Sequence, residues 1–363
     1  MRFMKRLLLF IIVIGTGYYI VTQTTMIPPT LIDRVKDKTL ELMDMNELKK
    51  IFQEEENDLP EKEVEKLAIQ EDLFSWIGKD PATLEKELGE AVRKDLSPYG
   101  YTWWVYTNHT SEYIQFGIAN NEIQTIYVAG DDLYLETLEV GQSYASVAEH
   151  YSFAHEVRYE KGASFYTFHL TEEDLMRRPL VKLADDLFLQ FYFDTYTNTL
   201  SSVRIATVDT LLSQLSYEIE YRGELPTEPE LSTQEWEKVD RGMEQQVFDI
   251  TNIMRYRFDK PSLKWAEDIQ QVAFMHSKDM ADQDYFSHES LDGRGLKERL
   301  AEKDVEYQAA GENIASQYPD APDAMEGWLN SEGHRNVLLD EQFTHLGVGV
   351  YRLYFTQNFS RFP

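Results

Sequence analysis

The chain has 363 residues, of which 42% are hydrophobic and 13% aromatic, so it can build hydrophobic cores and is not globally disordered. Its formal net charge of −29 excludes nucleic acid and anionic lipid as easy partners, because both are bound through clustered lysine and arginine. The absence of cysteine excludes disulfides, a thiol nucleophile, cysteine-ligated zinc and a lipoprotein anchor. The length favours two domains with additional segments.

The N-terminus combines a basic and an apolar segment. Arg2, Lys5 and Arg6 precede an apolar run that ends near Ile27. As a helix this run would be roughly 31 Å long, enough to cross a bilayer. No convincing cleavage site follows, so we expect residues 1–27 to be an uncleaved single-pass anchor in the cell membrane, with signal cleavage and secretion as the alternative. The positive-inside rule places the rest of the chain on the extracytoplasmic side.

A charged segment follows over residues 28–70. Pro28 and Pro29 end the apolar helix, and acidic runs such as Glu54–Glu56 come after them. Charge runs of this kind are typical of a solvated face. We expect a partly helical stalk between the membrane and the folded domains.

Residues 71–228 contain a weak internal duplication. Each copy has one helix-like stretch followed by three strand-like runs that are rich in aromatic and β-branched residues. Two such units predict a single α+β domain with an antiparallel sheet. The strand-like runs are 101–106, 112–118 and 122–128 in the first copy, and 164–170, 187–193 and 200–207 in the second.

An aromatic cluster in the first of these runs has two interpretations. Trp103, Trp104 and Tyr106 could form a platform for a carbohydrate or a peptide. In a strand, however, Trp104 and Tyr106 share one face while Trp103 points to the other. This alternation favours packing in the core on one side.

A segment rich in proline and glutamate, Leu225–Glu230, predicts a break between domains. We place the linker at 229–240 and the second domain at 241–363. Apolar spacings of three and four predict its first helix over 243–258. A second helix, expected from about residue 264 to 283, carries His276 on its apolar stripe, which favours a core histidine over a metal ligand.

Three polar residues of the second domain recur beside small or turn-forming residues in separate segments. His288 ends the sequence Tyr-Phe-Ser-His, and Glu312 lies in Gly-Glu-Asn-Ile. His334 lies in Trp-Leu-Asn-Ser-Glu-Gly-His-Arg, which begins at Trp328. We expect folding to gather these side chains in one cleft.

The order of these motifs resembles the CAP superfamily (the cysteine-rich secretory, antigen 5 and pathogenesis-related 1 proteins) in its cysteine-free bacterial form. The segment Asp95–Trp104 is similar to the CAP-associated N-terminal domain. The resemblance implies an α-β-α sandwich with a cleft of two histidines and two acidic residues. His288 and His334 match the histidines and Glu312 the first acid, whereas the second acid position is occupied by Ser331, a departure from the family pattern.

The expected cleft supports more than one chemistry. The neutral imidazoles of His288 and His334 could bind a divalent cation such as zinc, leaving a position for water. Glu312 could then orient that water or act as a base; without a metal, it would form an acid–base pair with a histidine. Ser331 with His334 could serve hydrolysis, but no G-x-S-x-G elbow supports this arrangement.

We therefore expect a non-enzymatic module that binds a cell-envelope ligand, such as a lipid, glycan or peptide, or a protein partner. The first alternative is a metal-assisted hydrolase or protease that uses the same cleft. The second alternative is a structural protein of the envelope. The fold alone does not choose between them, because one fold hosts many functions.

Overall fold

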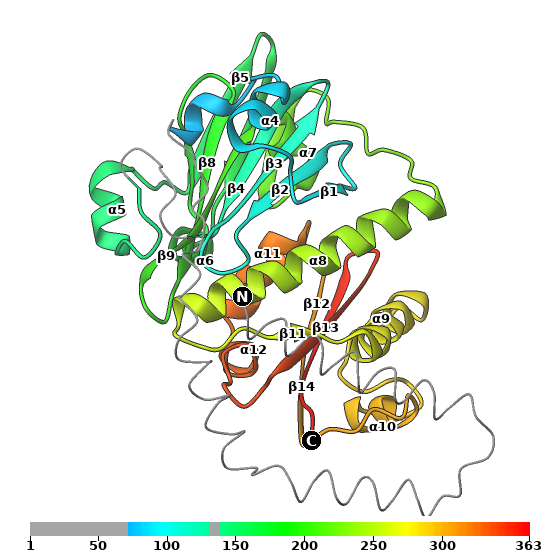
Figure 1. Cartoon of the computed structure of the whole chain (residues 1–363). Helices are drawn as coiled ribbons and strands as arrows, with labels where there is room; N and C mark the ends of the chain where they lie inside the picture. The colour runs from blue at the N-terminus through cyan, green and yellow to red at the C-terminus, as the bar shows by residue number, and fades with distance from the viewer. Residues whose placement is uncertain (1–71, 131–137) are drawn as a thin grey trace, which may run out of the picture. The chain divides into compact units, whose positions relative to one another are not determined.

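The computed structural model describes residues 72–130 and 138–363 (Figure 1). The predicted anchor (1–27) and stalk (28–70) lie outside the described residues. Within the described ranges, no helix combines the length and the apolar character needed to cross a membrane. The described residues form two domains that share one core.

The first domain is built on a seven-stranded antiparallel sheet with the order β1-β2-β3-β4-β9-β8-β7. Strands β4 and β9 pair at its centre and join the two sequence copies, as the predicted antiparallel sheet requires. The strands of this sheet are β1 (Arg93–Leu96), β2 (Thr102–Thr107), β3 (Tyr113–Ala119), β4 (Glu122–Val128), β7 (Leu180–Lys182), β8 (Leu187–Asp194) and β9 (Thr199–Thr207). Its helices are η1 (Leu73–Trp76), α4 (Ala82–Leu88), α5 (Tyr144–His150), α6 (Glu172–Arg177) and α7 (Val208–Gln214).

One predicted strand belongs to a different sheet from the one expected. The run 164–170 forms β6 (Ser164–His169), which pairs with β5 (Glu156–Lys161) and β10 (Glu218–Arg222) in a separate three-stranded sheet. The two partner strands are rich in charged residues, so their pairing was not expected. The prediction of a single sheet is therefore wrong for this run.

The aromatic cluster of β2 packs into two cores. Trp103 is 2% exposed and faces the second domain, whereas Tyr106 packs on the opposite face of the sheet. Trp104 is half-buried beneath Lys94, whose Nζ lies 3.5 Å from the ring centroid. Packing in the core, rather than a ligand platform, accounts for Trp103 and Tyr106.

The second domain is a four-stranded sheet between helices. Strand order is β11-β13-β14-β12, with β11 parallel to β13 and the other pairs antiparallel. The strands are β11 (Lys264–Trp265), β12 (Ala309–Ser316), β13 (His345–Tyr351) and β14 (Tyr354–Arg361). The helices are α8 (Thr233–Arg257), α9 (Glu267–Asp282), α10 (Leu296–Ala301), α11 (Ala321–Leu329) and α12 (Glu332–Leu338).

Helix α8 begins ten residues before the predicted start, at Thr233. Ser232 and Glu235 form a capping box that satisfies the first backbone N–H groups of this helix. Residues 233–240, which we expected within the linker, are therefore helical, and the irregular connection ends at Ser232. The missed signal is the capping-box pattern itself, three residues apart.

Alternate residues of β13 face opposite helices. Leu346, Val348 and Val350 pack toward α8 and α11, whereas Gly347 and Gly349 lie directly against the backbone of α9. A Cβ at Gly349 would come within 1.9 Å of the backbone nitrogen of Phe274. The Gly-x-Gly sequence thus allows a helix to sit unusually close to the sheet.

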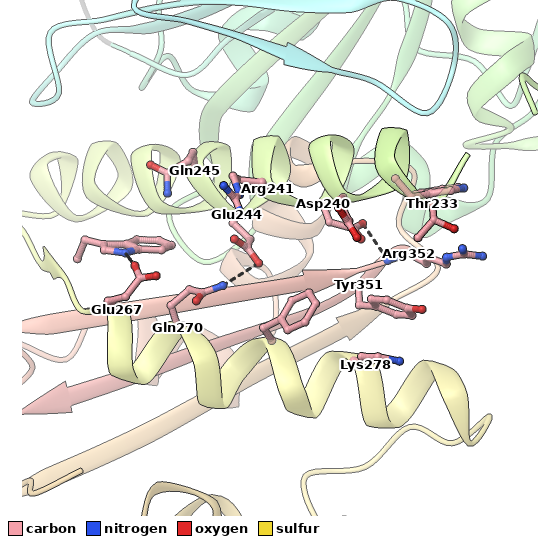
Figure 2. Close-up of a pocket in the computed structure, with 14 residues that line it drawn as sticks. Thr233, Asp240, Arg241, Glu244, Gln245, Glu267, Gln270, Lys278, Tyr351 and Arg352 are labelled. Atoms are coloured by element: carbon pink, nitrogen blue, oxygen red, sulfur yellow. Dashed lines mark hydrogen bonds between the residues drawn. The ribbon is translucent and has the colours of Figure 1, made fainter. Parts of the chain in front are cut away.

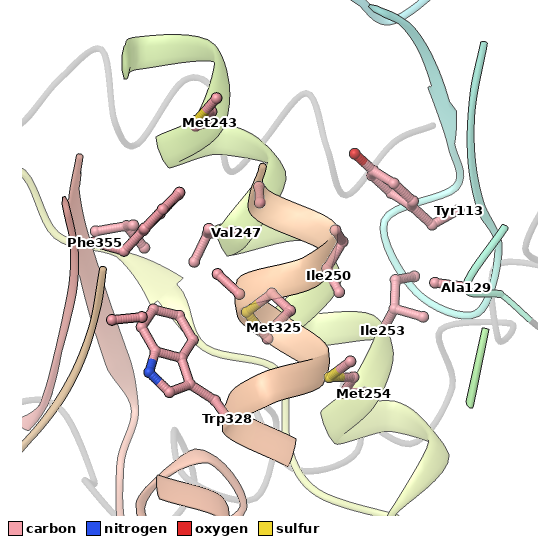
Figure 3. Close-up of a cluster of buried hydrophobic side chains, with 14 of the residues drawn as sticks. Tyr113, Ala129, Met243, Val247, Ile250, Ile253, Met254, Met325, Trp328 and Phe355 are labelled. Carbon is pink, nitrogen blue, oxygen red and sulfur yellow. The ribbon is translucent and has the colours of Figure 1, made fainter. Parts of the chain in front are cut away.

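A single hydrophobic core connects the two domains (Figure 3). Helix α8 lies between the first domain's sheet and α11, and side chains of both domains pack against it. The shared core includes Tyr101, Trp103, Tyr113 and Tyr127 from the first domain, and Met243, Val247, Ile250, Ile253, Met325, Trp328 and Phe355 from the second.

Buried charges also cross between the domains. Arg204 of β9 is fully buried; its Nη2 lies 2.8 Å from Asp320 and its Nη1 lies 3.1 Å from Asp323, both at the start of α11. At the next turn, Glu326 accepts hydrogen bonds from Ser201 (3.1 Å) and Ser202 (2.5 Å) through one carboxylate oxygen. The other oxygen of Glu326 is buried without a hydrogen-bond partner among the described residues.

Stability is expected to depend on pH through Glu326. Burial raises the pKa of this carboxyl to about 7, from an ordinary 4.5. A raised carboxyl pKa adds stability that is fully present below about pH 4.5 and is lost as the pH rises through 7. Glu326→Gln should therefore raise the free energy of unfolding at pH 8 by on the order of 2–3 kcal/mol and change it little at pH 4.5.

Urea unfolding at the two pH values measures this effect. Replacement of the exposed Glu160 by Gln is the matched control and should leave the pH dependence as it is. An equal effect of Glu326→Gln at both pH values would contradict the assignment.

Candidate functional site

Glu312 holds the centre of the predicted site. It lies on the edge strand β12, and its Oε1 lies 3.0 Å from Nδ1 of His288, in the loop between α9 and α10. Its Oε2 accepts a 2.6 Å hydrogen bond from Nη2 of Arg299 on α10. Arg299 also donates through Nη1 to the backbone oxygen of His288 at 2.9 Å. The buried Glu312 and Arg299 therefore fix both the ring and the backbone of an imidazole that is 55% exposed.

His334 reaches the site from α12. Its Nδ1 lies 2.9 Å from Oγ of Ser331, and its backbone oxygen accepts a 3.1 Å hydrogen bond from Asn313, the residue after Glu312. Burial lowers the pKa of His334, and the nearby charge of His288 lowers it further, which favours a neutral imidazole. Since β12 is an edge strand, segments from both of its faces can meet there. Glu332, the neighbour of Ser331, is exposed.

The charge of Glu312 is stabilised where it lies. Burial raises the pKa of a carboxyl, but the hydrogen bond from His288 and the charge of Arg299 outweigh burial and lower the pKa of Glu312. Glu312 is therefore an anion at neutral pH and accepts from Nδ1 of His288. In this tautomer, Nε2 of His288 carries the lone pair and faces outward as a base or ligand atom.

His276 lies beside the site but is part of the core. It is 1% exposed, and its Nε2 lies 3.0 Å from the backbone oxygen of Ser287, which fixes the loop that leads to His288. The expectation of a core histidine hydrogen-bonded to backbone is confirmed. Asn252 and Arg255 of α8 are also structural: Asn252 bonds both backbone groups of Leu263, and Arg255 donates to the carbonyls at the end of α12.

The donor set was compared with the predicted zinc site. Zinc sites ordinarily use three or four protein ligands. Among the described residues, no three His, Asp or Glu side chains are grouped so that they could hold a metal ion. Glu312 is occupied by His288 and Arg299, so His288 and His334 would need water to complete the coordination. The residues do not fit a three-ligand zinc site, and we route no chemistry through zinc.

Arg299 is the member of the site that the sequence did not reveal. It follows Lys297 and Glu298 in a run that resembles an exposed helix face, yet its side chain is only 7% exposed. The partner that buries it, Glu312, is on a different element. No local pattern indicates such a pair.

Comparison with known proteins follows the same division of the chain. Residues 77–217 match a family model described as "CAP-associated N-terminal", and residues 248–359 match one described as "Cysteine-rich secretory protein family". The Bacillus subtilis protein named "Uncharacterized membrane protein YlbC" is 42% identical over 287 residues, which cover 79% of this chain and 83% of that protein. The chain belongs to the CAP family.

Two solved structures resemble most of the CAP protein described here. An extracellular protein containing a SCP domain from Bacillus anthracis is 40% identical, with a TM-score of 0.77, and the match covers 84% of this chain and 99% of that one. A cysteine-rich secretory protein from Staphylococcus aureus has a TM-score of 0.72 over 82% of this chain and 95% of its own. At 24% identity, the second likeness concerns the fold alone. The α+β architecture with a C-terminal CAP sandwich is thus shared.

Proposed function

We propose that the CAP domain binds a cell-envelope ligand at His288, Glu312 and His334, without turnover. The observation that carries this proposal is the support of His288: its exposed ring is held by a buried ion pair between Glu312 and Arg299. A buried ion pair beneath an exposed imidazole costs desolvation, which suits a group preorganised for a ligand. A bound ligand would receive Nε2 of His288 as an acceptor.

We further propose that the ligand lies outside the cytoplasm and that residues 1–27 anchor the protein in the membrane. The names of two relatives support this location. The B. subtilis relative is named a membrane protein, and the B. anthracis relative is described as extracellular. The basic-then-apolar N-terminus has the order of a signal anchor.

Recovery of envelope material by the full chain tests the binding site. We expect the wild type to retain one class of lipid, glycan or peptide from an envelope extract, identified by mass spectrometry. His288→Ala should reduce this recovery at least tenfold, because the exposed ring contributes little to the core. His345→Ala, which changes a histidine of the same domain on β13, is the control. Equal recovery by the wild type and His288→Ala would contradict the proposal.

The pair of Ser331 and His334 favours a second candidate function, hydrolysis. The 2.9 Å separation of Oγ and Nδ1 is that of a nucleophile and its base. In serine hydrolases, a third group orients the base. No carboxylate among the described residues bonds to the ring of His334, so we rank binding above hydrolysis. Ester or amide turnover that disappears in Ser331→Ala would reverse this order.

A further inference from the structure

A groove separate from His288 runs between helices α8 and α9 (Figure 2). Its volume is about 690 Å³, within the range of ligand sites. Strand β11 pairs with only two residues of β13, His345 and Leu346. Beyond them, β13 has no neighbouring strand on this side within the described chain. We call this space the α8–α9 groove.

Two carboxyl groups of α8 point into the groove (Figure 2). Asp240 is 4% exposed and Glu244 is 6% exposed. Asp240 accepts a 3.0 Å hydrogen bond from the backbone N–H of Arg352, at the end of β13. Glu244 accepts from the backbone N–H of Val350 at 3.2 Å and from the side chain of Gln270 at 3.1 Å. Both carboxyls thus bond N–H groups at or just past the end of the open strand.

The two carboxyl groups lack a counter-charge. One oxygen of each, Oδ2 of Asp240 and Oε2 of Glu244, has no hydrogen-bond partner among the described residues. Neither carboxyl forms an ion pair with a described residue, although Arg241 and Arg352 are near enough to act on them electrostatically. Buried carboxylates are costly unless paired. A cation that entered the groove would supply the missing partner.

The remaining walls suit the stem of a lysine side chain. Aromatic rings line the groove, including Trp236, Trp265, Phe274 and Tyr351. Such rings pack against methylene groups and attract an ammonium ion through their faces. The protein itself uses this contact, since Nζ of Lys278 lies 4.7 Å from the centre of the Tyr351 ring.

The shape of the groove suits an extended chain. The lining residues of α8 run from Thr233 to Gln245, which corresponds to about 18 Å of helix. About five extended residues span that length. Open strand edges are a common docking place for extended peptides. A compact amine would leave most of the groove empty.

We propose that the α8–α9 groove binds an extended peptide segment whose lysine ammonium group pairs with Asp240 and Glu244. The methylene stem of the lysine lies against the aromatic walls, and the peptide follows the open edge of β13. This site shares no residue with the His288 site, so either can fail without the other.

Calorimetric titration of the full chain tests the proposal at pH 8. The probes are capped Ala-Ala-Lys-Ala-Ala and the same peptide with norleucine, which keeps the stem and lacks the ammonium group. We expect the lysine peptide to bind at least tenfold more tightly. The double variant Asp240→Asn with Glu244→Gln should weaken lysine-peptide binding at least tenfold, whereas Asp268→Asn, an exposed acid of α9 outside the groove, should not.

Two further measurements separate lost recognition from lost folding. Burial raises the pKa of both Asp240 and Glu244 to about 7, so both carboxyls gain charge between pH 6 and 8. Binding of the lysine peptide should tighten over this interval in the wild type and not in the double variant. Because the double variant removes buried charge, it should unfold at pH 8 at no lower a temperature than the wild type. The other charged or titratable groups that line the groove are Glu237 and Arg241 on α8, Glu267 and Lys278 on α9, and Tyr351 and Arg352 at the end of β13.

Several results would overturn the proposal. Equal binding of the lysine and norleucine peptides would remove the role of the ammonium group. Unchanged binding by the double variant would remove the role of the two carboxyls. Absence of lysine-peptide binding at millimolar concentration, or tighter binding of a glucosamine tetramer, would exclude a peptide as the occupant.

Discussion

Arg204→Ala is expected to lower the free energy of unfolding by about 3–5 kcal/mol, the usual cost of removing one partner from a buried ion pair. Arg204 is fully buried and is the cation that faces both Asp320 and Asp323. Its loss would leave two carboxyls in the interface without their counter-charge. Burial already raises the pKa of Asp320 to about 6 against the opposing effect of Arg204. Denaturant unfolding at pH 7 measures the change.

An exposed ion pair gives the comparison for this experiment. Arg158 pairs with Glu160 at 2.8 Å, and the two side chains are 59% and 64% exposed. Arg158→Ala should cost less than about 1 kcal/mol, because water screens the pair. If both substitutions cost the same, burial is not what makes Arg204 important. A triple variant with Arg204→Met, Asp320→Asn and Asp323→Asn should recover part of the stability lost in Arg204→Ala.

Gly349→Ala is expected to destabilise the CAP domain by about 3 kcal/mol or more, because overpacking here meets backbone rather than a movable side chain. The added Cβ would lie 1.9 Å from the nitrogen of Phe274 and 2.3 Å from the carbonyl carbon of Ala273. Helix α9 would have to move away from β13. That movement would also shift the loop that carries His288, so thermal unfolding and ligand recovery should both fall.

Gly333 provides the matched glycine. It lies in α12, and a Cβ there would meet no atom within 4 Å. Gly333→Ala should therefore stabilise the helix by about 0.5–1 kcal/mol, as alanine does where space and backbone allow it. A similar loss for the two substitutions would contradict the role assigned to the close packing of α9 on β13.

Much of the fold could be predicted because it follows from local periodicity. All six predicted strands of the first domain are strands, and the apolar stripe of α9 buries His276 as expected. The site motifs were also readable, since His288, Glu312 and His334 each lie in a short characteristic segment. In the structure, the first two are in direct contact.

What could not be predicted depends on pairing between distant elements. Strand β6 has the composition of a sheet-forming run, but its sheet is decided by β5 and β10. Arg299 looks exposed until Glu312 is placed beside it. Asp240 and Glu244, one turn apart on α8, look like solvated acids until β13 brings its open edge against them. In each case, the deciding partner is far away in the sequence.

The core that the two domains share affects what a protease can achieve. The connection over residues 223–231 is irregular and largely exposed, which makes it a natural place for cleavage. Yet the halves on either side are joined by the buried faces of α8 and by Arg204. A nick there would divide the polypeptide and leave the particle whole, so the CAP half would not be shed as a free fragment.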